Sequence, residues 1–127
     1  MRLPHPALIA LRTLATLALS ACIAQAGWAA AFLGGEGKYR AFHEVGAGVT
    51  VAVLVVTALL YVVLRRFAGA VSTVLALLLA AVSVAQYALG EMDLIGLHIF
   101  LGVLIAMVAT ALTSWTFRHH YEPPARG

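Results

Sequence analysis

Two histidines lie inside long apolar segments of this chain, each a few residues after a polar turn. His43 lies in the segment YRAFHEVGAG and His98 in LIGLHIFLGV. An ionisable side chain at membrane depth is costly, so it is rare and indicates a functional site. Because neutral imidazole donates a ring nitrogen to metals, two such side chains predict a metal-centred cofactor bound between them. Haem is the most natural candidate for this cofactor.

The segments that carry these histidines have the length and composition of membrane spans. The chain has 127 residues, of which 63% are hydrophobic and 10% charged, whereas a soluble domain has about 25% charged residues. Four apolar stretches cover residues 7–33, 41–64, 67–90 and 93–117, and each exceeds the ~20 residues that a helix needs to cross a bilayer. The short turns make successive helices antiparallel. We therefore expect one all-α transmembrane domain over 1–127, an up-down-up-down four-helix bundle.

The arginines orient this bundle. Among the basic residues, only Lys38 and Arg40 fall in the turns after the first and third stretches. The others lie at the N-terminus, between the second and third stretches, and at the C-terminus: Arg2, Arg12, Arg65, Arg66, Arg118 and Arg126. The excess of positive charge predicts that both termini of a multi-pass protein are cytoplasmic, with His43 and His98 near the extracytoplasmic face.

Aromatic residues fit two interfacial belts, as is usual for membrane proteins. Near the extracytoplasmic side they are Trp28, Tyr39 and Tyr87, and near the cytoplasmic side Tyr61, Trp115 and Tyr121.

The first stretch has a second interpretation as an export signal. Its basic start and the small-x-small sequence Ala24-Gln25-Ala26 fit signal cleavage after Ala26, and LSAC, ending at Cys22, is similar to a lipoprotein signal. However, the uncharged run 13–33 is longer than the usual signal core of about 7–15 residues. We expect a retained helix in which Cys22 is a small buried hydrophobic residue, with processing at Cys22 or Ala26 as the alternatives.

The two halves of the chain share a pattern. In the first half Gln25 precedes His43 and Gly46, and in the second half Gln86 precedes His98 and Gly102. This pattern predicts an internal two-helix repeat about an axis along the membrane normal. Such an axis would bring the two histidines face to face across the centre of the bundle.

Small residues follow each histidine on the same helical face, since residues three and four apart are neighbours. Gly46 follows His43, with Thr50 one turn further, and Gly102 follows His98. Small side chains leave room for a flat porphyrin, although membrane helices also use glycine simply to pack closely.

Further polar residues could complete a haem site. A ligating histidine gives its second N–H to an acceptor, for which Gln25, Gln86, Thr50 and helix carbonyls are candidates. Lys38 and Arg40 could pair with the anionic propionates of haem.

Other interpretations of the histidines stay open. The pair could be structural, could carry protons, or could bind another ligand or metal, although zinc usually takes three or four protein ligands. His5, His119 and His120 lie at the opposite side, where a second cofactor site and solvated tails are the alternatives.

The layout of four helices, with histidines near the outer ends of the second and fourth, resembles one half of a haem A synthase. It is also similar to small bacterial four-helix membrane proteins with the order Gln, His, Gln, His. The resemblance covers nearly the whole chain and implies a b-type haem at His43 and His98 in a bacterial inner membrane. The chain departs from haem A synthases at Arg40, where that family has a glutamate, and in having one bundle rather than two.

The expected function is that of a b-type cytochrome with one bis-His haem near the extracytoplasmic face. Two axial ligands leave no open iron position, which favours an electron carrier over an enzyme. A quinol or a membrane redox complex would be its partner, and no pattern indicates nucleic-acid binding. The alternatives are a cofactor-free accessory subunit or assembly factor of a membrane complex, and a protein of haem transfer or sensing.

Overall fold

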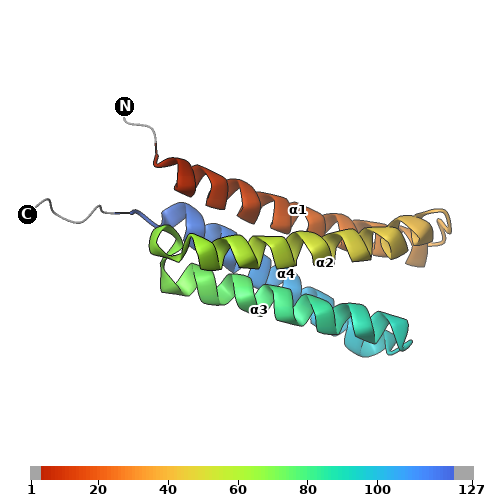
Figure 1. Cartoon of the computed structure of the whole chain (residues 1–127). Coiled ribbons are helices and arrows are strands. Elements are labelled where there is room, and N and C mark those ends of the chain that lie inside the picture. Colours follow the sequence, from red (N-terminus) through yellow and green to blue (C-terminus); the bar gives the residue numbers. More distant parts are fainter. Residues whose placement is uncertain (1–3, 122–127) are drawn as a thin grey trace, which may run out of the picture.

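The computed structural model describes residues 4–121, so Arg2 and Arg126 lie outside the described range. These residues form four helices: α1 (Pro6–Leu33), α2 (Tyr39–Val63), α3 (Arg65–Glu91) and α4 (Ile95–Arg118). Each helix packs along its predecessor, and α4 returns to α1, whereas α1 and α3 scarcely touch (Figure 1). The predicted up-down-up-down bundle is confirmed, with helix ends within two residues of the expected bounds.

All four helices are long and apolar enough to cross a membrane. Inside a bilayer each backbone polar group needs a partner within the protein, and a helix supplies that partner within the segment. At the start of α1, Pro6 is the first helical residue, and the Nδ1 of His5 caps the helix by accepting a hydrogen bond from the amide of Ala7. The length and composition of the helices make the chain a multi-pass membrane protein with four candidate spans.

The turn between α2 and α3 is tighter than the other two. It is centred on Leu64. The backbone of Gly69 has a non-helical φ of 76°, which kinks the first turn of α3 relative to the rest of the helix. A positive φ of this kind is accessible to glycine at no steric cost. The regular part of α3 therefore begins after Gly69.

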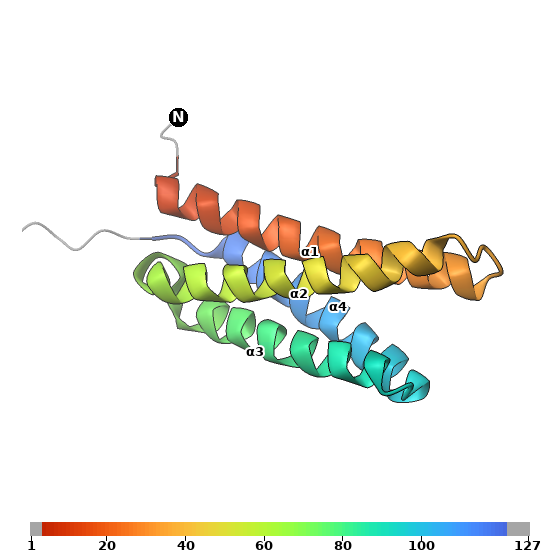
Figure 2. The same cartoon turned by 45° about the vertical axis from the view of Figure 1, so that its right-hand side comes forward.

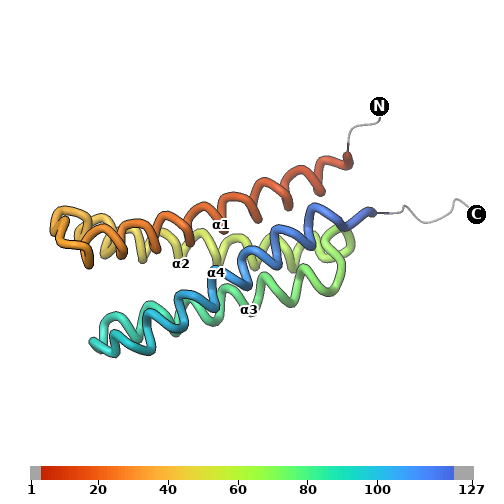
Figure 3. Tube along the Cα trace, turned by 180° about the vertical axis from the view of Figure 1, so that it is seen from behind, coloured from red at the N-terminus to blue at the C-terminus, as the bar shows by residue number. Residues whose placement is uncertain are grey.

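The two ends of the bundle differ in packing. We call the end with both termini and the turn at Leu64 the closed end, and the end with loops 34–38 and 92–94 the open end. Among residues 4–121, no buried residue follows Cys22 in α1, precedes Leu54 in α2, follows Ser83 in α3 or precedes Ile105 in α4. Toward the open end the pair α1–α2 diverges from the pair α3–α4 (Figures 2 and 3). The core therefore occupies the closed end and the middle of the bundle.

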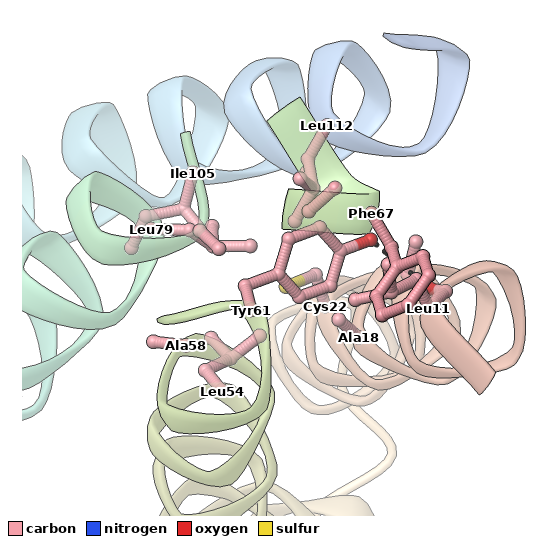
Figure 4. Close-up of a cluster of buried hydrophobic side chains, with 14 of the residues drawn as sticks. Leu11, Ala18, Cys22, Leu54, Ala58, Tyr61, Phe67, Leu79, Ile105 and Leu112 are labelled. Atoms are coloured by element: carbon pink, nitrogen blue, oxygen red, sulfur yellow. Dashed lines mark hydrogen bonds between the residues drawn. The ribbon is translucent and has the colours of Figure 1, made fainter. Parts of the chain in front are cut away.

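Tyr61 lies at the centre of this core, where its side chain is fully buried. Its hydroxyl donates a hydrogen bond to the carbonyl of Leu11 at 3.0 Å (Figure 4). The same hydroxyl lies 2.8 Å from the hydroxyl of Thr116. These bonds join α2 to α1 and α4. The expected place of Tyr61 in an interfacial belt is wrong, because its ring fills the core and its hydroxyl finds partners there.

Candidate functional site

His43 and His98 face each other across the open end. His43 lies in the second turn of α2 and His98 in the first turn of α4, so each helix pair contributes one ring. The ring centres are 6.0 Å apart and the ring planes are nearly perpendicular, at 88°. The predicted approach of the two histidines is confirmed.

Each ring is held by the helix that precedes it in the chain. The Nδ1 of His43 lies 3.1 Å from the carbonyl oxygen of Gln25, and the Nδ1 of His98 lies 2.9 Å from that of Gln86. A carbonyl oxygen only accepts, so each Nδ1 is the donor. In a neutral imidazole the Nε2 then keeps its lone pair. A second N–H bonded in this way is the usual arrangement of a histidine that ligates a metal.

Each glutamine side chain packs against the second helix of its own helix pair. A Cβ at Gly46 would collide with the Nε2 of Gln25 and the ring of Trp28, and a Cβ at Gly102 would lie 3.1 Å from the Nε2 of Gln86. Each glutamine thus rests on the glycine that follows the histidine of the next helix. The two halves of the sequence pattern therefore occupy equivalent positions in the structure, as a two-helix repeat requires.

The two glutamines also differ. The Nε2 of Gln86 donates to the carbonyl of His98 at 2.7 Å, whereas both polar atoms of the Gln25 side chain are buried without a partner among the described residues. The acceptors for the histidine rings are thus the backbone carbonyls at these positions, one of the alternatives that the sequence left open.

A cavity of about 430 Å³ lies between the diverging helix pairs, lined by both histidines. Its volume is within the range of about 300–1,000 Å³ that is usual for small-molecule and cofactor sites. Cys22, Leu54 and Ile105 line it on the side of the core. The other lining side chains are mostly apolar, and the polar ones besides the histidines are Gln25, Thr50, Ser83, Gln86 and Tyr87.

Several alanines line this space, together with only one of the two predicted glycines. Gly102 lines the cavity, but the position beside Gly46 is filled by Gln25. The small lining residues that the sequence interpretation missed include Ala26, Ala29 and Ala30 of α1 and Ala106 of α4. The three alanines of α1 are spaced three and four residues apart, so they share one helical face, and this spacing could have identified them from the sequence.

The predicted basic residues lie beside the cavity and do not line it. The guanidinium of Arg40 is 2.8 Å from the carboxylate of Glu44, and the ammonium of Lys38 is 3.7 Å from that of Glu36. All four side chains are more than half exposed. Such pairs contribute little to stability, so either cation could exchange its carboxylate for another anion at low cost.

The remaining histidines belong to the closed end. His5 stacks on Phe67 with ring centres 4.5 Å apart, while His119 and His120 line a separate hollow with Trp115 and Arg118. Within residues 4–121, no three His, Cys, Asp or Glu side chains lie close enough together to bind one metal ion. A zinc site of three or four protein ligands therefore has no ligand set in this range.

Comparisons with protein families, with curated proteins and with solved structures found no match for this chain.

Proposed function

We propose that the chain is a b-type cytochrome that binds one haem between His43 and His98 and transfers electrons. The observation that carries this proposal is the neighbouring pair of imidazoles, each with its Nδ1 bonded to a helix carbonyl, which leaves the lone pair of Nε2 available to a metal. When bound, a haem held by both histidines would supply an iron that exchanges one electron and would leave no position on it for a further ligand.

The spacing of the rings fits this cofactor. With Fe–N bonds of ~2 Å and a ring nitrogen about 1 Å from its ring centre, two imidazoles on one iron have centres about 6 Å apart. The observed separation is 6.0 Å. The perpendicular ring planes would also be compatible with a haem held by one histidine from each helix pair.

The surroundings of the histidines suit an amphipathic macrocycle. The apolar cavity between the helix pairs would exclude water from the porphyrin face, and low polarity around a haem is one of the factors that set its potential. Haem propionates at the open end would lie nearest to Arg40 and Lys38, which would then exchange Glu44 and Glu36 for them. The chain itself would hold the haem through one nitrogen of each histidine and would place the cations of Arg40 and Lys38 beside the site.

The site lies at one end of the spans, so a single haem would not carry electrons through the whole bilayer. We infer that the open end faces the extracytoplasmic side of a bacterial inner membrane and that a quinol or a membrane redox complex exchanges electrons there. The distribution of arginines supports this orientation.

The proposal can be tested with protein purified after haem-replete expression. We expect one haem b per chain, a low-spin spectrum, and rapid reduction by a quinol in detergent solution. A colourless protein would contradict the proposal and favour a cofactor-free accessory subunit. Haem that resists the quinol but passes readily to an apo-acceptor protein would instead indicate haem transfer.

A further inference from the structure

The closed end carries positive charge without matching carboxylates in the described part of the chain. Its basic side chains are Arg12, Arg65, Arg66 and Arg118. The acidic residues within 4–121 all belong to the open end: Glu36, Glu44, Glu91 and Asp93. Both ion pairs found in this range are at the open end as well. Glu122 follows α4 but lies outside the described residues. The closed end is thus an electropositive surface of the described bundle.

Part of this surface is hollowed at the end of α4. The hollow has a volume of about 260 Å³ and is lined by Trp115, Arg118, His119 and His120. The guanidinium of Arg118 lies 5.4 Å from the ring centre of Trp115, and its Nε donates to the carbonyl of Ser114 at 3.3 Å. The side chain is therefore held along the helix, and its terminal N–H groups stay available to a ligand.

A neighbouring helix compensates for the unfavourable polarity of this helix end. The last carbonyls of a helix repel anions, but an Nη of Arg12 donates to the carbonyl of Phe117 at 3.3 Å. The same guanidinium lies 5.5 Å from the ring centre of Phe117. Arg12 thus satisfies one terminal carbonyl and adds a second positive charge beside α4.

His119 is fixed by close packing against the kinked start of α3. A Cβ at Gly69 would lie 2.9 Å from the Cε1 of His119, so the ring occupies the space that only a glycine leaves. This contact holds one imidazole of the hollow in place, whereas His120 is exposed. The hollow therefore combines one guanidinium with two N–H-bearing rings, one of them fixed.

We propose that this hollow binds the phosphate of an anionic phospholipid headgroup. Guanidinium groups bind phosphate oxygens strongly, and basic pockets at the ends of transmembrane helices suit anionic lipid headgroups. A lipid fits better than free phosphate because Trp115, which lines the hollow, is 44% exposed, at the level where aromatic rings contact both headgroups and acyl chains. This proposal is independent of the haem proposed for the opposite end.

The two tryptophans, one at each end of the bundle, allow a direct test. In a Trp28→Phe variant, Trp115 is the sole tryptophan and reports on lipids at the closed end. We would reconstitute it in phosphatidylcholine vesicles that contain a small fixed fraction of brominated phosphatidylglycerol or brominated phosphatidylcholine. Brominated acyl chains quench only nearby tryptophan. We expect an apparent preference of at least about fivefold for phosphatidylglycerol, the effect of one basic residue at a membrane surface. The Trp115→Phe variant, which reports on Trp28, should show no such preference.

Substitutions then locate the site. Arg118→Gln in the Trp28→Phe background should reduce the preference about fivefold. Arg40→Gln changes the net charge equally at the other end and should leave the preference intact. Because Arg118 is exposed, its variant should fold, and unchanged quenching by brominated phosphatidylcholine would verify this. Equal quenching by both lipids in the parent variant, or equal losses in the two charge variants, would overturn the proposal. Relief of the quenching by millimolar inorganic phosphate would also overturn it, in favour of a free-phosphate site.

Discussion

At the scale of single residues, the candidate site depends on which nitrogen of each histidine carries the hydrogen. In both rings a main-chain carbonyl, of Gln25 or Gln86, fixes Nδ1 as the donor. A backbone carbonyl cannot be removed by substitution of its side chain, so the same tautomer should persist in most variants of the glutamines. The sequence could predict the two histidines and their neighbours, but not this atom, because any residue type supplies a carbonyl.

Arg40 provides a test of the rim of the site. Its guanidinium is paired with Glu44, and we expect it to turn to a propionate when haem is bound. Arg40→Ala should leave the fold intact and should weaken haem retention or lower the reduction potential, because a nearby cation disfavours the oxidised, more positive iron. A potentiometric titration measures this, with Arg66→Ala at the closed end as the matched control. Equal haem content and potential in all three proteins would remove Arg40 from the site.

At the scale of helices, each histidine is positioned by the packing of one helix pair. Gln25 and Trp28 of α1 fill the space beside Gly46 of α2, and Gln86 of α3 rests near Gly102 of α4. The repeated Gln, His, Gly pattern predicted that the pairs are equivalent. It left open whether the glycines serve contact between helices or leave space for a cofactor, because glycine suits both, and it did not identify the alanines of α1 that line the cavity.

Two glycines on α2, one packed against α1 and one on an open face, allow a test of whether helix packing positions His43. A side chain at Gly46 would collide with Gln25 and Trp28, whereas the Cβ position at Gly48 has no atom within 4 Å. Gly46→Ala should therefore push α1 from α2, lower the thermal stability, and reduce haem occupancy at limiting haem. Gly48→Ala should retain wild-type values, since it makes the same change in composition on an open face. Thermal unfolding and haem content of the two variants measure this. Equal behaviour would mean that the contact between Gln25 and Gly46 does not position His43.

At the scale of the whole molecule, the bundle is closed at one end and divided at the other. Tyr61 and its neighbours fill the closed end. The helix pairs diverge toward the other end (Figure 2), and the cavity is lined by residues of all four helices there. Hydrophobicity and short turns were enough to predict the four spans, their order and their bounds. The divergence could not be read from the sequence, because it depends on the sizes of side chains that meet between helices far apart in the chain. For the same reason Tyr61 was misplaced at the membrane surface.

The orientation of the molecule in the membrane is a separate prediction. In a Cys22→Ala background, a cysteine introduced at Glu36 in the first loop should react with a membrane-impermeant thiol reagent added to intact cells. A cysteine introduced at Arg65 should react only after the cells are opened, because arginine-rich segments stay in the cytoplasm. Labelling in the reverse order would place the open end in the cytoplasm and would exclude an extracytoplasmic redox partner.

The most direct measurement for the central proposal is the absorption and electron paramagnetic resonance spectrum of four single variants purified after haem-replete expression. His43→Ala and His98→Ala each remove one axial ligand, so both should lose the low-spin signal and retain high-spin haem or none. His119→Ala and His120→Ala lie at the closed end and should keep the full low-spin signal at one haem per chain. A low-spin spectrum that survives His43→Ala or His98→Ala, or that is lost with His119→Ala or His120→Ala, would contradict the proposed ligand pair.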